Sequence, residues 1–370
     1  MKKSIFVAAI VGIVGLTACG NKGNVRMGSL SDFDSLSYAL GANIAYSLSV
    51  EMRDIPFDYK AMDKGLEQGA FGKSSESHDE SIEKLRTYFM SQRPQRVQAI
   101  AEKRAQADSV RLAEGDTTKV EYPVADPDMF ETEEERTELS YAFGNDIGYN
   151  IANSGLPLQI VWVTEAMQNV RDNNAKMTQA ETNEYLQYYF TEKRPAENAA
   201  ASEAWLAKIE KKSGVKKTES GLLYKVTKKG DESVKATDSR DVVKVHYTGR
   251  TREGKVFDSS IFKNRPKEQQ EMLKQQDPEN YAKNEPVEFP LNRVIPGWTE
   301  GMKLVGKGGK ITLWIPSELA YGPRGAGRDI GPNEALEFEV ELIDVTPFEK
   351  PEPEPDDANA VDAFAEPAQK

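Results

Sequence analysis

The feature that most constrains the fold is an internal duplication in the first 213 residues. Residues 37–41 read SYALG and residues 140–144 read SYAFG. The pair Tyr-Phe at 88–89 recurs at 189–190, and Arg-Pro at 93–94 recurs at 194–195. Such a repeat indicates a structural unit that cannot bury its apolar face alone. We therefore expect two helical copies that pack on each other.

Each copy has the apolar spacing of an amphipathic helix. Side chains four residues apart line one face in both copies: Leu36, Leu40, Ile44 and Leu48, and Leu139, Phe143, Ile147 and Ile151. Pro56 and Pro157 each precede a second amphipathic stretch, and a third, aromatic helix runs on into a segment rich in Ala, Glu and Lys. These segments, 97–112 and 196–211, favour helix but hold too few apolar residues to be buried all round. They predict long, exposed helices.

Composition and pattern divide the chain into seven segments. They are a signal peptide (1–18), a tether (19–30), helical repeat 1 (31–113), a linker (114–134), helical repeat 2 with a long connecting helix (135–213), a β-rich domain (214–347) and an acidic Pro/Ala tail (348–370). The composition of the tail is typical of disorder. The fold class expected for the whole chain is α+β.

The amino terminus has the pattern of a secretory signal. Lys2 and Lys3 precede an almost continuous apolar run over 4–16, which is too short to span a membrane. Residues 16–19, LTAC, resemble the bacterial lipobox, in which Cys19 would be lipidated. An ordinary signal peptide that happens to contain a cysteine is the alternative. We expect a lipid-anchored protein, at the outer membrane and facing the periplasm.

Charge and composition exclude several classes of function. The chain has 60 acidic and 48 basic residues, a net charge of −12, which argues against general nucleic-acid binding. Its one cysteine excludes an intramolecular disulfide and a cysteine-cluster metal site. The two histidines, His78 and His246, leave little material for a metal site or a nucleophile–histidine pair. We expect no metal and no cofactor, a solvated loop at His78, and no catalytic cluster between Asp32 and Lys212.

The last third of the chain has the two-residue period of β-strands. Val243, Val245 and Tyr247 alternate with polar residues, and a turn at 252–255 leads into a return strand at Val256. Residues 336–342 alternate apolar residues with glutamates, which predicts a strand with one wet acidic face. His246 lies on the face opposite Tyr247 and is expected to form structural hydrogen bonds. The pattern predicts an antiparallel sheet wrapped on one short helix near Trp298, with an apolar cleft.

Five motifs in this domain resemble the FKBP-type peptidyl-prolyl isomerases. They follow the family's order: VHYTG at 245–249, GKVFDSS at 254–260, VIPGW at 294–298, AYG at 320–322 and FEVEL at 338–342. The resemblance covers about residues 218–346. The layout upstream resembles the macrophage infectivity potentiator branch, in which one helical unit dimerises two chains. This chain carries two units, so we expect a monomer with an internal pseudo-dimer, or a homodimer.

The resemblance implies a site and a set of roles. The implied catalytic residues are Tyr247, Phe257, Asp258, Trp298, Tyr321 and Phe338, and the implied substrate-binding residues are Val287, Val294, Ile295 and Ile330. Trp298 would form the floor, Asp258 and the Tyr321 hydroxyl the polar edges, and the Ile295 N–H would hold a substrate carbonyl. Rotation about an X–Pro bond crosses about 18–20 kcal/mol and needs amide resonance to be lost, not a covalent nucleophile. A dry aromatic cup favours the less polar twisted amide.

Two segments depart from the family pattern. A charged insert, 261–285, with a helical core at 267–275, replaces a short segment; it would narrow the pocket, recruit a partner or lie in solvent. The loop after Tyr321 is polar and leaves Ile330 to cover the substrate. We expect a prolyl isomerase that assists folding of proline-containing, unfolded or partly folded envelope proteins. The alternative is a chaperone or adaptor lipoprotein whose pocket binds without catalysis. Measuring whether the helical repeats prevent aggregation without the last domain would distinguish the two functions.

Overall fold

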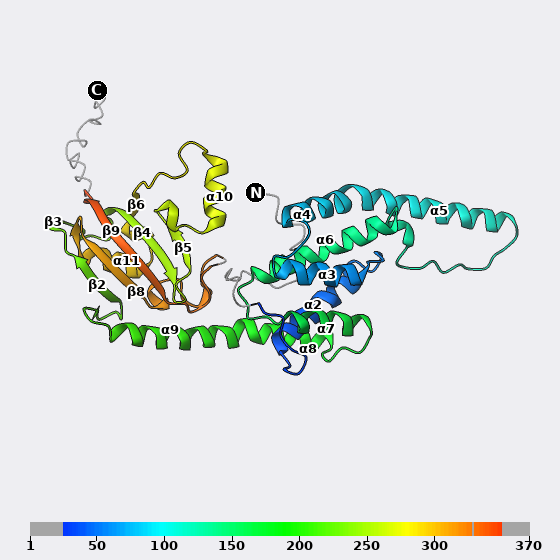
Figure 1. The fold of residues 1–370 in the computed structure, drawn as a ribbon, viewed down its shortest axis with the longest axis horizontal. Helices are drawn as coiled ribbons and strands as arrows, with labels where there is room; N and C mark the ends of the chain where they lie inside the picture. Colours follow the sequence, from blue (N-terminus) through cyan, green and yellow to red (C-terminus); the bar gives the residue numbers. More distant parts are fainter. Residues whose placement is uncertain (1–24, 328, 350–370) are drawn as a thin grey trace, which may run out of the picture. The chain divides into compact units, whose positions relative to one another are not determined.

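The computed structural model describes residues 25–327 and 329–349 as two compact units (Figure 1). The first unit comprises residues up to 205 together with 251–257 and 321–335. The second comprises 206–250, 258–320 and the residues from 336 onward. The predicted signal peptide, Cys19 and nearly all of the tail lie outside the described residues. Helices precede an antiparallel sheet along the chain, so the predicted α+β class is confirmed.

The first unit holds the two helical copies, except for the last five residues of the final helix. Copy 1 consists of α2 (Ser35–Glu51), α3 (Tyr59–Ala70), α4 (His78–Thr87), a π-helical turn (Tyr88–Gln92) and α5 (Arg93–Ala113). Copy 2 consists of α6 (Glu133–Ala152), α7 (Ile160–Arg171), α8 (Gln179–Tyr188), a second π-helical turn (Tyr189–Lys193) and α9 (Arg194–Glu210). The third helix of each copy thus runs on into the predicted long helix through one π-helical turn. Pro94 is the second residue of α5, which directly follows the π-helical turn of copy 1.

The two copies interlock. Helix α2 of copy 1 packs on α7 and α8 of copy 2, while α6 of copy 2 packs on α3 and α4 of copy 1. The two apolar stripes predicted on α2 and α6 are buried in one common core. Equivalent hydrogen bonds repeat this relation: the Gln159 N–H donates to Ser37 Oγ (2.8 Å), and the Asp58 N–H donates to Ser140 Oγ (2.9 Å). The expectation that the copies pack on each other is confirmed.

Glycines let the backbones of α3 and α6 approach closely. A Cβ atom on Gly144 would lie 1.9 Å from the carbonyl oxygen of Met62, and one on Gly65 would lie 2.2 Å from that of Tyr141. Real Cβ atoms do not approach backbone atoms so closely, so both positions require glycine. This contact is therefore specified by the two helix sequences together.

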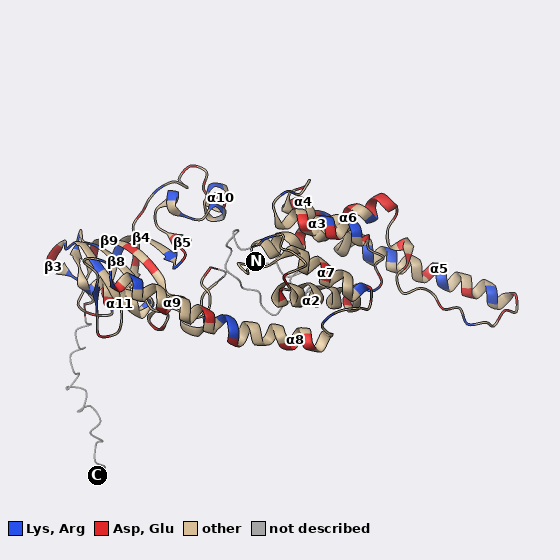
Figure 2. Cartoon of the chain, turned by 60° about the horizontal axis from the view of Figure 1, so that its bottom comes forward, with Lys and Arg blue, Asp and Glu red and all other residues tan. Residues whose placement is uncertain are grey.

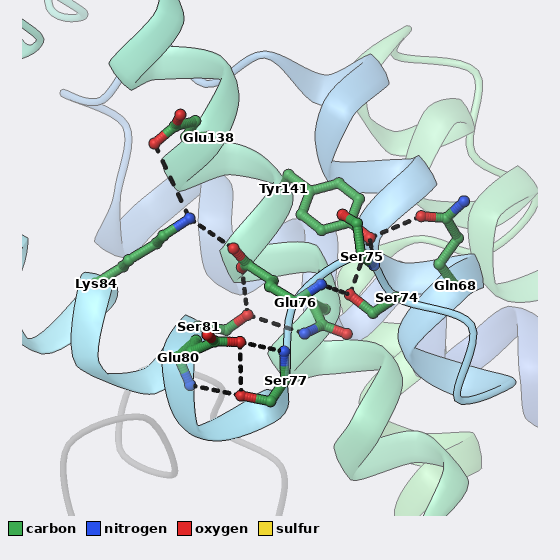
Figure 3. Close-up of polar contacts among 11 residues, drawn as sticks. Gln68, Ser74, Ser75, Glu76, Ser77, Glu80, Ser81, Lys84, Glu138 and Tyr141 are labelled. Atoms are coloured by element: carbon green, nitrogen blue, oxygen red, sulfur yellow. Dashed lines mark hydrogen bonds and ion pairs between the residues drawn. The ribbon is translucent and has the colours of Figure 1, made fainter.

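A polar network ties the loop between α3 and α4 to α6 (Figure 3). The Tyr141 hydroxyl donates to Gln68 Oε1 (2.6 Å) and lies 2.9 Å from Ser74 Oγ. On the other side of the loop, Glu76 accepts a hydrogen bond from Ser81 (2.5 Å) and pairs with Lys84 (2.5 Å). The network fixes the start of α4 against the opposite copy.

His78 departs from its prediction as a solvated loop residue. It is the first residue of α4, which begins with a capping box formed by Ser77 and Glu80. Its Nε2 lies 2.8 Å from Oδ1 of the buried Asp146, and its ring stacks on Tyr149 at 3.7 Å between centroids. Both partners of His78, Asp146 and Tyr149, lie on α6 and are distant from it in sequence.

Helix α5 and the segment after it also differ in part from expectation. Ile100 is the one buried residue of α5, and Lys and Arg are interspersed with Asp and Glu along it, as predicted for an exposed helix (Figure 2). The linker, however, returns along this helix: Asp126 pairs with Arg104 at 2.6 Å. It then buries Met129 and Phe130 in the common core. Two apolar residues in a polar segment were too weak a signal for this docking.

The second unit is built on an antiparallel sheet. Its strands are β1 (Lys216–Lys217), β2 (Leu223–Lys228), β4 (Val242–Thr251), β5 (Val256–Ser259), β6 (Val287–Pro290), β8 (Lys310–Ile315) and β9 (Leu336–Thr346). Their order is β1-β2-β8-β9-β4-β5, with β6 also paired to β4, while β3 (Asp231–Lys235) and β7 (Gly306–Lys307) form a separate pair (Figure 1). Strand β9 lies inside the sheet and alternates between buried apolar residues and more exposed glutamates, as predicted.

A short helix, α11 (Pro296–Gly301), packs against this sheet. A Cβ atom on Gly297 would lie 2.5 Å from the Ile315 side chain, and one on Gly301 would lie 2.6 Å from Leu313. The predicted sheet wrapped on a short helix is thus confirmed. The insert contains α10 (Lys267–Gln276), which matches its predicted helical core. Among the described helices, none is long and apolar enough to cross a bilayer.

Candidate active site

An aromatic cluster surrounds Trp298 in the second unit. Trp298, on α11, is 4 % exposed, and its ring meets those of Tyr247 and Phe338 edge to face, at 5.4 and 5.3 Å between centroids. Phe289 of β6 completes the cluster at 5.7 Å from Trp298 and 5.8 Å from Tyr247. Edge-to-face pairs at such distances add stabilisation beyond the buried area. The cluster joins α11, β4, β6 and β9 through aromatic side chains.

One carboxylate is held beside this cluster. The Tyr247 hydroxyl donates to Oδ2 of Asp258 at 2.5 Å, and the Ser259 N–H donates to Oδ1 at 2.8 Å. The Ser260 hydroxyl fixes the strand that carries Tyr247, because it accepts a hydrogen bond from the Tyr247 N–H at 2.9 Å. His246 Nδ1 lies 3.2 Å from the same hydroxyl, so its predicted structural role is confirmed.

Three of the implied substrate-binding residues lie in the same unit. Val287, on β6, pairs with Val245 of β4, two residues before Tyr247. Val294 and Ile295 lead into α11, and the Ile295 carbonyl accepts a hydrogen bond from the Trp298 N–H at 2.9 Å. All three side chains are half-buried. They therefore leave some apolar surface in reach of solvent.

The other implied site residues belong to the first unit. Phe257 and Ile330 are buried, whereas Tyr321 is 39 % exposed. Ile330 and Ala326 exchange two backbone hydrogen bonds, of 2.9 and 3.1 Å, which close the loop between them. The structure thus brings together Tyr247, Asp258, Trp298 and Phe338 and places Phe257, Tyr321 and Ile330 in the other unit.

Sequence reasoning missed one member of the cluster. Phe289 touches both Tyr247 and Trp298, yet it stands in none of the five motifs. Its signal was the alternation Val287-Glu288-Phe289, which places Phe289 on the same strand face as Val287.

A hollow elsewhere in the described structure offers different chemistry. It measures about 420 Å³ and lies along α4 and α6, where it is lined by four glutamates and Lys84. Its lining includes no aromatic side chain. Among the described residues there is also no group of three or more His, Cys, Asp or Glu side chains that could hold a metal ion. The aromatic cluster with Asp258 is therefore the stronger candidate site.

Two family models match this chain. Residues 233–343 match the family described as FKBP-type peptidyl-prolyl cis-trans isomerase. Residues 136–226, which include most of the second helical copy, match the domain amino terminal to FKBP-type peptidyl-prolyl isomerase.

The alignments with individual relatives cover most of the length of each relative. A probable FKBP-type peptidyl-prolyl cis-trans isomerase FkpA from Neisseria meningitidis is 39 % identical over 222 residues, which is 56 % of this chain and 74 % of the relative. The outer membrane protein MIP of Legionella longbeachae is 31 % identical over 227 residues, 57 % of this chain and 86 % of the relative. The crystal structure of FkpA from Escherichia coli is 36 % identical and covers 49 % of this chain and 78 % of its own, with a TM-score of 0.35. The chain belongs to the FKBP-type peptidyl-prolyl cis-trans isomerase family and is an isomerase.

Proposed function

We propose that the aromatic cluster around Trp298 is the floor of the pocket in which this chain isomerises X–Pro bonds. The observation that carries the proposal is the 2.5 Å hydrogen bond between Tyr247 and Asp258, set beside an edge-to-face cluster that contains Trp298 and Phe338. The proposed roles of Phe257, Tyr321 and Ile330 in substrate binding rest on the family resemblance alone, through two motifs and the loop after Tyr321. Val287, Val294 and Ile295 bind the substrate chain.

The proposed mechanism uses desolvation rather than covalent chemistry. A planar X–Pro amide is polar and strongly hydrated, and it loses resonance as it twists. An apolar aromatic surface removes its water and so favours the twisted state over the planar one. The Asp258 carboxylate and the Tyr321 hydroxyl supply polar edges, and the Ile295 N–H holds the rotating carbonyl.

The proposed setting is the bacterial envelope. The pattern around Cys19 supports a lipid anchor, and one relative is named an outer membrane protein. The clients would be unfolded or partly folded envelope proteins that contain proline. Metabolic labelling with a radioactive fatty acid tests the anchor: label is expected on the expressed chain and not on Cys19→Ser, and equal labelling would contradict it.

The proposed assembly is a monomer with an internal pseudo-dimer. Each copy's first helix already packs on the second and third helices of the other copy, so these faces are not available to a second chain.

A cis/trans assay without protease tests the pocket, using the whole chain and a proline peptide. Phe257→Ala is expected to lower kcat/KM at least tenfold, equivalent to about 1.4 kcal/mol of transition-state stabilisation. Phe348→Ala is the matched control, because Phe348 is 40 % exposed and stacks on Arg240. Equal kcat/KM for wild type and a folded Phe257→Ala chain would refute the pocket assignment.

A further inference from the structure

Helix α9 carries two polar side chains on its less exposed face. Ser202 is 5 % exposed and Asn198, one turn earlier, is half-buried, while the intervening residues 199–201 are exposed. Buried polar groups in folded proteins have hydrogen-bond partners, and a buried serine in an exposed helix needs a specific reason. Its partners identify that reason.

Both side chains bind one loop of the first unit, residues 321–335. Ser202 Oγ donates to the Asn333 carbonyl at 2.9 Å and accepts from the Ala335 N–H at 3.0 Å. Asn198 Nδ2 donates to the Pro332 carbonyl at 3.0 Å.

Asn198 also binds the turn between β4 and β5. Its Oδ1 accepts a hydrogen bond from Arg252 Nη2 at 3.1 Å, so its amide joins this turn to the loop. The turn and the loop are in addition joined directly, because Lys255 Nζ lies 2.6 Å from Asp329 Oδ1. Helix α9 therefore holds two connected segments.

These contacts reach Tyr321 through Asn333. Asn333 adopts a φ of +55°, a left-handed conformation that asparagine tolerates better than most residues. Its N–H donates to the carbonyl of Gly322 at 2.9 Å, next to Tyr321, and its side chain donates to the Pro195 carbonyl of α9 at 3.2 Å. The conformation of the loop beside Tyr321 is thus linked to α9 by consecutive hydrogen bonds.

The other helical copy provides an internal comparison. Alignment of Arg93-Pro94 with Arg194-Pro195 places Val97 of α5 opposite Asn198, and Ala101 opposite Ser202. Val97 is 46 % exposed. Helix α9, which contacts the 321–335 loop, therefore has hydrogen-bonding residues at these two positions. Helix α5 has apolar residues there.

We propose that Ser202 and Asn198 are positioning residues for the isomerase: they hold the 321–335 loop so that Tyr321 and Ile330 keep the arrangement that substrate requires. This inference rests on the proposed roles of Tyr321 and Ile330. It assigns the connecting helix a part in catalysis beyond that of a spacer. The helix sets the activity and peptide preference of the domain to which it leads.

The test compares Ser202→Ala and Asn198→Ala with wild type in the whole chain. The matched control is Ser109→Ala, because Ser109 lies exposed on α5 and bonds only its own helix at Ala105 among the described contacts. We expect kcat/KM to fall about tenfold in both variants. The ratio of kcat/KM between peptides that differ before proline should change, and Ser202→Thr, which keeps the hydroxyl, should restore both values. A merely structural loss would lower all peptides alike.

Amide hydrogen exchange supplies a readout that does not depend on activity. Exchange at Ala335, whose N–H donates to Ser202, should accelerate in Ser202→Ala and not in Ser109→Ala. Wild-type exchange, or faster exchange with wild-type kcat/KM and peptide preference, would overturn the inference. If Ser202→Ala does not fold, the kcat/KM and the peptide preference of Asn198→Ala decide the question. Loss of activity in these variants together with full activity in Phe257→Ala would refute the pocket assignment instead.

Discussion

The hydroxyl of Tyr247 and the carboxylate of Asp258 are 2.5 Å apart, and this hydrogen bond joins β4 to β5 beside the aromatic cluster. The contact orients both groups before any substrate arrives. Preorganised polar groups stabilise a transition state without the cost of reorientation. The pair therefore acts as one unit, and its two members should not contribute independently.

A double-mutant cycle on this pair is the first prediction. Asp258→Ala should lower kcat/KM about tenfold or more, and Tyr247→Phe less, because it keeps the ring against Trp298. The double variant should lose less than the product of the two effects, since both remove the same hydrogen bond. The control is Asp344→Ala, which removes a surface carboxylate paired with Lys307. Multiplicative effects in the cis/trans assay would contradict the coupling.

The sequence predicted those features that depend on local periodicity or on a motif. The stripe from Leu36 to Leu48 could be predicted because side chains four residues apart share a helix face. Trp298 and Asp258 could be predicted because they stand in ordered motifs. The bond between Gln159 and Ser37 could not, since it joins distant positions whose spacing carries no signal. The same holds for His78, whose partner Asp146 lies in the other copy.

The second prediction concerns pH. Burial raises the pKa of Glu334 to about 7, from an ordinary 4.5, although the Gly331 N–H (2.7 Å) and the Arg252 guanidinium (3.7 Å) favour the charged form; the nearby Glu253 opposes it. Because the pKa of Glu334 is higher in the folded than in the unfolded chain, its protonated carboxyl stabilises the fold. This contribution to the free energy of unfolding is complete below about pH 4.5 and is lost as the pH rises through about 7. Between pH 5 and 8, wild type should therefore lose stability relative to Glu334→Gln.

Urea unfolding at several pH values measures this difference. The two stability curves can diverge by at most about 1.4 kcal/mol per pH unit, because one proton is involved. Glu203→Gln, at an exposed position of α9, is the control and should run parallel to wild type. Parallel curves for Glu334→Gln would show that its carboxyl titrates alike in the folded and unfolded chain.

The third prediction follows from the interlocked copies. Ser37→Ala and Ser140→Ala each remove the acceptor of one backbone N–H, that of Gln159 or Asp58, at equivalent positions of the two copies. An unpaired buried donor costs about 1–3 kcal/mol, so both variants should unfold at lower urea concentration. Ser109→Ala should change stability by less than about 0.5 kcal/mol. Wild-type stability in both variants would mean that these bonds do not hold the copies together.

The fourth prediction is that one chain forms the pseudo-dimer alone. Sedimentation of the lipid-free protein should give the mass of a single chain at every concentration, because each copy already covers the helices of the other. A mass of two chains would contradict this assembly.

A shortened linker should reverse that result. The segment after α5 runs back along the helix, where the Met129 carbonyl accepts a hydrogen bond from Arg96 at 2.8 Å. Removal of residues 115–126 leaves Glu114, Pro127 and Asp128 between Ala113 and Met129, and these four steps extend at most about 14 Å. The helix from Arg96 to Ala113 rises about 26 Å. The shortened chain cannot place Met129 beside its own Arg96, so we expect it to exchange copies with a second chain and sediment as a dimer. A folded, monomeric deletion variant would show that linker length does not direct the pairing.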